Sequence, residues 1–210
     1  MNAREALARL QRLGVPAVRT AEVAVALGLS KPAATMTLSR LAASGLVTAV
    51  RHGTWWIDGP LDPYRLPEIL SAPFDSYVSL HTALHVRGLI GQIPEVLFAA
   101  TQGRTMRITT NAGTYSFHHL APEVFGGFEE TPAGLRLATA EKALFDFAYL
   151  SAGRSRLFAT LPDLELPRGF KVSEARRWLR RIPSARSRTL TEARLSSFLE
   201  AGRGTADTDR

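Results

Sequence analysis

The sequence predicts an α+β protein in two parts. Apolar residues recur at helical spacing through the first 45 residues, β-rich runs separated by turns follow over residues 95–139, and helical periodicity returns after residue 139. The turn-rich segment Asp58–Pro63 separates the first part from the rest. We therefore expect one domain over residues 1–58, a second over residues 64–202, and a disordered tail over residues 203–210.

The composition is that of an ordinary globular protein, with 45% hydrophobic and 21% charged residues in a chain of 210. The chain has no cysteine, which excludes disulfides, Cys-ligated metal sites and cysteine nucleophiles. No apolar run approaches the ~18–20 residues that cross a bilayer, and the N-terminus lacks the apolar core of a signal peptide. We therefore expect a cytoplasmic protein with no membrane partner.

Basic charge is concentrated towards both ends of the chain. Residues 1–57 carry seven Lys or Arg against two Asp or Glu, residues 151–210 carry thirteen against seven, and residues 58–150 carry six against ten. Basic segments suit a polyanion such as nucleic acid, whereas the acidic middle suits a folding core or a protein contact. The alternative explanation is that arginine is simply abundant, since the chain has 23 Arg and 3 Lys.

The N-terminal part predicts three helices followed by a β-hairpin. Asn2, Thr20 and Ser30 stand at expected helix N-caps, Gly45 follows the third helix, and Gly53 lies at the hairpin turn. Three helices and a hairpin in this order are typical of a winged helix-turn-helix. The expected elements are helices ending at Gly14, over Ala21–Leu27 and over Lys31–Ser44, and strands over residues 46–50 and 54–57.

The third helix is expected to present a DNA-reading face opposite its leucines. Small polar and apolar side chains on that face suit base edges in a major groove, and the flanking cations suit phosphates. A winged helix used only for protein contact is the alternative. The residues predicted to bind double-stranded DNA are Lys31, Pro32, Thr35, Met36, Ser39, Arg40, Arg51 and His52.

The rest of the chain predicts a mixed α/β domain that ends in helices. We expect helices over residues 65–70, 77–88, 173–181 and 190–201 and one after Thr139, with strands over residues 95–101, 106–110 and 114–119 and a hairpin over residues 126–139.

A cluster of arginines lies on the predicted helix over residues 173–181. Like charges four residues apart destabilise an isolated helix by roughly a few tenths of a kcal/mol, which indicates an anionic partner. The alternative is a solvated face partly paired with Glu174 and Glu192. The residues expected to contact the DNA backbone here are Lys171, Arg176, Arg177, Arg180 and Arg181.

Two segments resemble AbiEi-type antitoxins. The first is Tyr-Val-Ser-Leu-His-Thr-Ala-Leu-His at residues 77–85, followed by Gly-Leu-Ile-x-Gln-Ile-Pro at residues 88–94. The second is Ala-Thr-Ala-Glu-Lys-Ala-Leu-Phe-Asp at residues 138–146, which is similar to the family's Ala-Thr-Pro-Glu-Lys-Ala-Leu-x-Asp with Ala140 in place of proline. The resemblance covers nearly the whole chain.

This resemblance implies an antitoxin of an AbiE (type IV) toxin–antitoxin system, linked to phage defence. It implies that the winged helix represses its own operon at inverted repeats, and that the second domain is needed to neutralise a cognate nucleotidyltransferase-like toxin. We expect two copies to place their third helices in successive major grooves.

Catalytic motifs are mostly absent from the sequence. It contains no Gly-rich phosphate loop, no Gly-x-Gly-x-x-Gly and no Gly-x-Ser-x-Gly. His81 and His85 have metal-ligand spacing but lack a zincin glutamate between them, and His118 and His119 point to opposite faces of a strand. Asp146 is expected to be a buried polar anchor.

We therefore expect no enzymatic activity, no metal and no cofactor. Two alternatives remain: a winged-helix repressor whose second domain binds a small effector, and a nucleic-acid enzyme that carries a DNA-targeting module.

Overall fold

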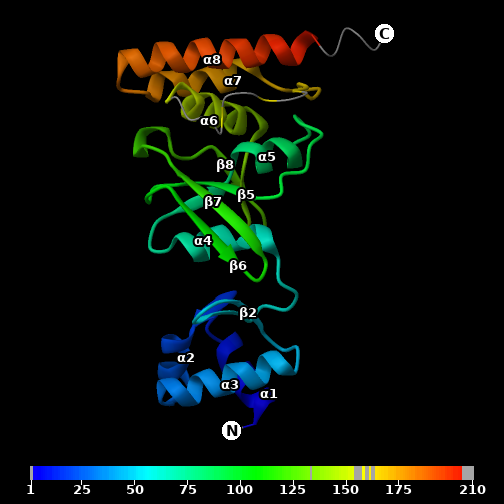
Figure 1. Ribbon diagram of the computed structural model, residues 1–210, viewed down its shortest axis with the longest axis vertical. Helices are drawn as coiled ribbons and strands as arrows, with labels where there is room; N and C mark the ends of the chain where they lie inside the picture. The colour runs from blue at the N-terminus through cyan, green and yellow to red at the C-terminus, as the bar shows by residue number, and fades with distance from the viewer. Residues whose placement is uncertain (1, 133, 154–157, 159–160, 162–163, 205–210) are drawn as a thin grey trace. The chain divides into compact units, whose positions relative to one another are not determined.

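The computed structural model describes residues 2–132, 134–153, 158, 161 and 164–204 (Figure 1). The chain is mixed α+β. It divides into two compact units: unit 1 comprises residues 1–63 and 109–113, and unit 2 comprises residues 64–108 and 114–210. Among the described residues, none of the helices combines the length and the apolar character needed to cross a membrane.

Unit 1 contains three helices and a three-stranded sheet, an order compatible with the expected winged helix-turn-helix. Its sheet has the strand order β1-β3-β2, with both pairings antiparallel. The elements are α1 (Ala3–Gln11), β1 (Ala17–Arg19), α2 (Thr20–Leu27), α3 (Lys31–Ala43), β2 (Thr48–Arg51) and β3 (Thr54–Trp56).

The local signals place most helix ends in unit 1 as expected. Asn2 Oδ1 accepts a hydrogen bond from the Glu5 N–H at 2.8 Å, and Ser30 Oγ accepts one from the Ala33 N–H at 3.4 Å. Gly45 has a φ of +69°, the left-handed conformation that glycine adopts after a helix.

Thr20 is not the N-cap of the second helix but its first residue, because α2 begins one residue earlier than expected. Its hydroxyl accepts a hydrogen bond from Trp55 Nε1 at 3.0 Å. The short strand β1 before it was also not expected, and it pairs with β3 so that Ala17 lies opposite Trp56.

Unit 2 is built on a six-stranded mixed sheet with the order β6-β7-β5-β4-β9-β8. Its strands are β4 (Ser76–Val78), β5 (Leu97–Thr101), β6 (Met106–Thr110), β7 (Gly113–His119), β8 (Phe128–Glu130) and β9 (Arg136–Ala138). Its helices are α4 (Leu66–Ser71), α5 (Leu80–Val86), α6 (Ala140–Ala152), α7 (Val172–Arg177) and α8 (Ala185–Gly204). The tip of the β6–β7 hairpin, residues 109–113, is grouped with unit 1.

The prediction of one helix over residues 77–88 was wrong at its start. Residues Ser76–Val78 form β4, which pairs antiparallel with β5 and parallel with β9. These long-range pairings also satisfy backbone groups of β5 and β9 along the edges that face β4, and a helix at the same place would leave those edges unpaired. The helix α5 therefore begins only at Leu80, whose φ is +55°.

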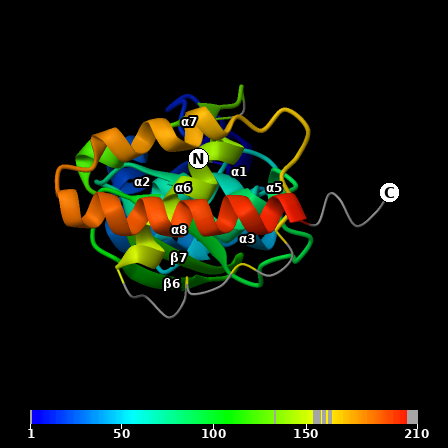
Figure 2. The ribbon, with the colours of Figure 1, turned by 90° about the horizontal axis from the view of Figure 1, so that it is seen from above.

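The C-terminal helices cover one side of unit 2. Thr139 Oγ1 accepts a hydrogen bond from the Lys142 N–H at 3.2 Å and caps α6, as the sequence predicts. Helices α6, α7 and α8 pack against one another (Figure 1), and α7 and α8 run side by side when seen from above (Figure 2). The helix α8 extends through Arg203 and Gly204, where a tail was expected, and residues 205–210 lie outside the described part.

Each unit has its own hydrophobic core. The core of unit 1 joins its three helices to the strands and includes Leu10, Val23, Leu38 and Leu41. The core of unit 2 is larger and includes Tyr77, Phe145, Phe147 and Phe158, all of which are at most 1% exposed. Separate cores are what is expected of domains that fold as units.

Candidate nucleic-acid interface

Helix α3 has one buried face and one open face. Ala34, Leu38 and Leu41 are 0% exposed and lie in the core of unit 1. The open face carries the exposed side chains of Thr35, Met36 and Ser39. The side chain of Met36 is 57% exposed. An apolar side chain held in solvent at the centre of a helix face is available for contact with a partner.

Cationic side chains border this open face. Lys31 and Arg40 lie on α3 itself and are exposed, while Arg51 at the end of β2 is half-buried and His52 in the turn is exposed. Among the described residues, none forms an ion pair with Lys31, Arg40 or Arg51. Their charge is therefore uncompensated within the described structure.

A hollow of about 710 Å³ lies between α3 and the strands β2 and β3. It brings together five of the predicted DNA-binding residues, whereas Met36, Ser39 and Arg40 lie outside its lining. The five are Lys31, Pro32, Thr35, Arg51 and His52.

Sequence reasoning missed two residues of this hollow. Arg19 ends β1 and is exposed, and Trp55 on β3 is half-buried with its ring in the wall. The neighbouring Trp56 is 0% exposed. Arg19 carried no signal, because the strand that places it was not predicted.

The second predicted basic set lies on unit 2, at α7 and the 3₁₀ turn Trp178–Arg181 that follows it. Its five residues, Lys171, Arg176, Arg177, Arg180 and Arg181, are all exposed.

Three of these arginines have contacts within unit 2. Arg177 Nη2 lies 2.9 Å from Glu174 Oε2, Arg176 Nη2 donates to Ser196 Oγ at 3.4 Å, and the Arg181 guanidinium carbon lies 4.7 Å from the centre of the Trp178 ring. The pairing with Glu174 that the alternative interpretation predicts is thus present, and it is made by Arg177. Part of the positive charge of this set is therefore engaged within unit 2.

The chain matches no known protein-family model, and no curated protein matches it. Its resemblance to AbiEi antitoxins therefore depends on the two sequence motifs alone. Both motifs contribute to the interior of unit 2, and they meet in a buried polar network.

This network connects α6 to β4 and the residue that follows it. Lys142 Nζ donates to Asp146 Oδ1 and, at 2.9 Å, to Tyr77 Oη. Tyr77 Oη donates to Asp146 Oδ2 at 2.9 Å, and Ser79 Oγ donates to the same oxygen at 2.7 Å. All four residues are 0% exposed. Asp146 is therefore the buried polar anchor that was expected.

Aromatic rings surround the buried ammonium group. Lys142 Nζ lies 4.5 Å from the centre of the Trp178 ring and 5.2 Å from that of Phe145. Burial lowers the pKa of Lys142 and raises the pKa of Asp146, while the attraction between the two side chains opposes both shifts. A network closed to solvent in this way holds elements together and offers no access to a substrate.

The histidines of unit 2 are not arranged as a metal site. His81 packs on Phe98 and Phe147, with ring centres 4.7 and 4.9 Å away, whereas His85 Nδ1 lies 3.3 Å from the Ile90 carbonyl oxygen. His118 Nε2 lies 2.9 Å from Ser116 Oγ. Over the described ranges, no group of three or more His, Asp or Glu side chains could hold a metal ion.

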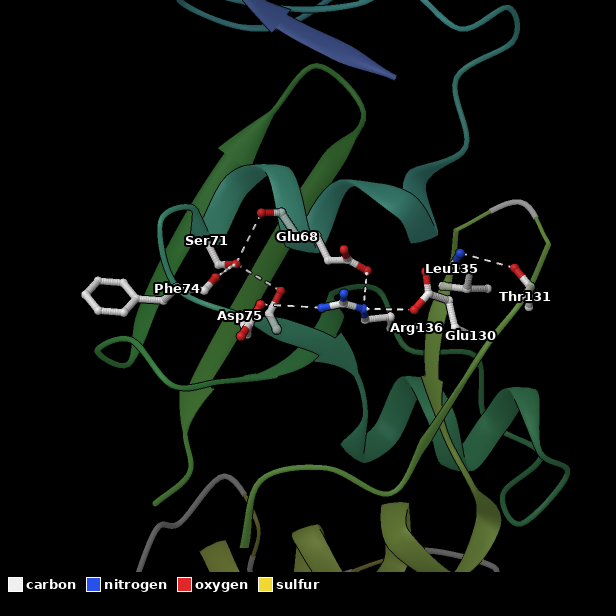
Figure 3. Close-up of polar contacts among 9 residues, drawn as sticks. Glu68, Ser71, Phe74, Asp75, Glu130, Thr131, Leu135 and Arg136 are labelled. Carbon is white, nitrogen blue, oxygen red and sulfur yellow. Dashed lines mark hydrogen bonds and ion pairs between the residues drawn. The ribbon is translucent and has the colours of Figure 1, made fainter. Parts of the chain in front are cut away.

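An ion-pair cluster is centred on Arg136 of unit 2. Arg136 on β9 lies among three carboxylates from separate segments (Figure 3). Its Nε lies 3.5 Å from Oε1 of Glu68 on α4 and 3.4 Å from Oε2 of Glu130 on β8. Its Nη1 lies 3.5 Å from Oδ1 of Asp75, which precedes β4. Partial burial raises the pKa of Glu68, and Arg136 opposes this rise. The cluster holds the β8–β9 hairpin against α4.

Proposed function

We propose that this protein binds DNA through the open face of α3 and the turn between β2 and β3. One observation carries the proposal: an exposed strip of uncharged side chains on α3 is bordered by cations that no described carboxylate neutralises. Side chains such as Thr35, Met36 and Ser39 can approach base edges in a major groove, while Lys31, Arg40 and Arg51 hold phosphates. The chain then acts as a repressor at inverted half-sites.

A binding assay on the DNA upstream of the protein's own gene tests this proposal. The double variant Arg40→Ala/Arg51→Ala should weaken binding sharply, because each arginine supplies a charge-assisted contact to a phosphate. Arg4→Ala/Arg12→Ala removes the same charge from α1 and its end and serves as the matched control. Equal affinity of the two double variants would show that the docking face lies elsewhere.

The wider role that we propose is that of an antitoxin which also represses its own operon. The support is the pair of AbiEi-like motifs, whose residues Tyr77, Ser79, Lys142 and Asp146 come together in one network. Hydrogen bonds between residues 65 to 69 positions apart therefore join the two motifs in one structural feature. The partner in this proposal is a nucleotidyltransferase-like toxin encoded beside the protein.

Co-expression with the neighbouring gene tests the antitoxin role. If that gene arrests growth, the full chain should restore growth. The variant Arg40→Ala/Arg51→Ala should lose repression, and its effect on rescue shows whether DNA binding and neutralisation use different surfaces. Failure of the wild-type chain to restore growth would remove the antitoxin role and leave the DNA-binding proposal intact.

One observation favours the alternative of a repressor controlled by a small effector. Unit 2 has a hollow of about 430 Å³, lined by His118, Tyr149, Phe158 and Thr191 among others. It combines aromatic walls with hydroxyl groups, as small-molecule sites do. A small molecule that raises the thermal stability of the chain and releases it from DNA would establish this alternative, and Tyr149→Phe should weaken that response.

A further inference from the structure

We propose that the hollow between α3, β2 and β3 holds one phosphodiester of a DNA strand together with its sugar. This assigns DNA binding to Arg19 and Trp55, neither of which the sequence analysis selected. The inference depends on the DNA-binding role proposed above and specifies how one backbone segment is held. Three features of the hollow carry it: its shape, its charge and its tryptophan wall.

The hollow has three walls from different parts of unit 1. The end of β1 and the start of α2 contribute Arg19 to Ala21, the first turns of α3 contribute Lys31, Pro32 and Thr35, and the strands β2 and β3 contribute residues between Ala49 and Trp55. Asn111, in the turn of the β6–β7 hairpin that is grouped with unit 1, completes the lining. Its volume of about 710 Å³ falls within the ~300–1,000 Å³ range of ligand-binding clefts. A sugar-phosphate unit of a DNA strand can therefore enter it.

The hollow is lined by positive charge and therefore suits an anion. Arg19, Lys31 and Arg51 all line it, and none of the residues lining it is acidic. The acidic residue closest to Arg19 in the sequence is Glu22. Its Oε2 accepts a hydrogen bond from the backbone N–H of Arg19 at 2.7 Å and forms no ion pair with the guanidinium group among the described contacts. The three cationic side chains remain without an ion-pair partner among the described residues. The N-terminus of the 13-residue helix α3 adds partial positive charge at the same place.

The tryptophan wall favours a DNA strand over a free phosphate. Trp55 Nε1 donates to Thr20 Oγ1 at 3.0 Å, and this bond between residues 35 apart fixes the orientation of the indole ring. Trp55 is half-buried, packs against the core of unit 1 and also lines the hollow. A free phosphate would contact the cationic side chains and make no apolar contact with the indole ring. A deoxyribose carries apolar C–H groups that can pack on this ring.

Titration of the full-length protein with its upstream DNA tests the inference. Arg19→Ala should weaken binding about tenfold on both specific and random DNA, and should lower the slope of log affinity against log salt by roughly one. Arg12→Ala, an exposed arginine of the same unit outside the hollow, is the matched control and should change affinity less than about twofold. Equal effects of the two substitutions would overturn the assignment of Arg19.

Fluorescence supplies a second readout. Trp56 is 0% and Trp178 8% exposed, so the more exposed Trp55 should give most of any fluorescence change on DNA binding. Trp55→Phe, which keeps a ring in place, should remove that change. If the DNA-dependent change persists in Trp55→Phe, or if wild-type protein binds DNA without it, the sugar does not lie on this ring.

Two further outcomes are separable. Pyrophosphate that displaces the DNA and changes Trp55 fluorescence at low millimolar concentration would overturn the DNA strand as occupant in favour of a small anion. Wild-type protein that binds its upstream DNA no better than Arg40→Ala/Arg51→Ala would refute the proposed function itself. Normal wild-type binding with unaffected Arg19→Ala and Trp55→Phe variants would refute only the present inference.

Discussion

Lys142 and Asp146 form an ion pair one helical turn apart on α6, and neither side chain is exposed to solvent. The pair reaches beyond its own helix, because Tyr77 and Ser79 donate to Asp146 from the other motif. The part of the sequence that resembles an antitoxin family therefore encodes a connection between α6 and the centre of the sheet. Removing either charge would leave the other buried without compensation.

We expect Asp146→Ala to lower the free energy of unfolding by about 3–5 kcal/mol, because it leaves the Lys142 ammonium buried and unpaired. Lys142→Met/Asp146→Leu removes both charges and should cost less than Asp146→Ala alone. Urea unfolding followed by circular dichroism measures both. As a control, Glu174→Ala removes a partner of the exposed Arg177 and should change stability by less than about 1 kcal/mol.

The two faces of α3 should respond differently to truncation. Leu38→Ala empties a fully buried position and should cost about 2–5 kcal/mol of stability. Met36→Ala, at a side chain that is 57% exposed, should leave stability within about 0.5 kcal/mol and change the DNA-sequence preference instead. Thermal unfolding and binding to a panel of altered half-sites separate the two effects. A Met36→Ala protein with unchanged preference would exclude Met36 from base contacts.

Two histidines, the buried His118 and the half-buried His81, should make unit 2 sensitive to acid. Burial lowers the pKa of His81 to about 4 and that of His118 to about 4, and the charge of His81 contributes to the latter shift. Both values lie below the ordinary 6.5, so the unfolded chain binds more protons between pH 6.5 and 4. The stabilising contribution of the neutral rings is present above pH 6.5 and is lost as the pH falls towards 4.

Replacing His81 tests this pH dependence. His81 Nδ1 is buried without a hydrogen-bond partner in the described structure, so His81→Phe removes both an unsatisfied polar atom and a titrating group. We expect a smaller loss of stability between pH 6.5 and 4 than in the wild-type protein, measured by urea unfolding at several pH values. His52→Gln, at an exposed residue of unit 1, should leave the profile unchanged.

Both the backbone conformation and the close packing at Gly127 favour glycine, and a comparison with Gly88 distinguishes the two effects. Its φ is +74°, and a Cβ there would lie 2.5 Å from Trp178 and 2.9 Å from Lys142. Gly88 has the same φ with nothing within 4 Å, so Gly88→Ala should cost only the ~1–2 kcal/mol of a left-handed alanine. Gly127→Ala should cost about 1–3 kcal/mol more, because the ring must move. Equal losses on thermal unfolding would mean that Trp178 shifts freely.

The arginines after α7 should separate structural from DNA-binding roles. The guanidinium carbon of Arg181 lies 4.7 Å from the centre of the Trp178 ring, and Arg181→Glu should lower stability because it removes this cation–ring contact. Arg180→Glu is expected to leave stability unchanged and, if this surface binds the DNA backbone, to weaken binding equally on all sequences and reduce its salt dependence. Unchanged affinity and salt slope in Arg180→Glu would remove this surface from the interface.

Local sequence signals predicted the helices well where caps and periodicity agreed. Asn2, Ser30 and Thr139 cap their helices because a side-chain oxygen needs only the next few residues to satisfy backbone N–H groups. The hairpin turning at Gly53 and the open face of α3 were found from the same short-range information. The predicted DNA-contact residues from Lys31 to His52 accordingly occupy surface positions in unit 1.

The sequence by itself thus determined the α+β class, most helix ends and the exposed strip on α3, since each depends on neighbours within a few residues. Only the tertiary structure decided that Ser76–Val78 would be a central strand, that Lys142 and Asp146 would join Tyr77, and that Arg19 and Trp55 would share a hollow with Lys31. These features depend on partners tens of residues away, and local propensity carries no information about which distant segment will pair with a strand or cover a charge.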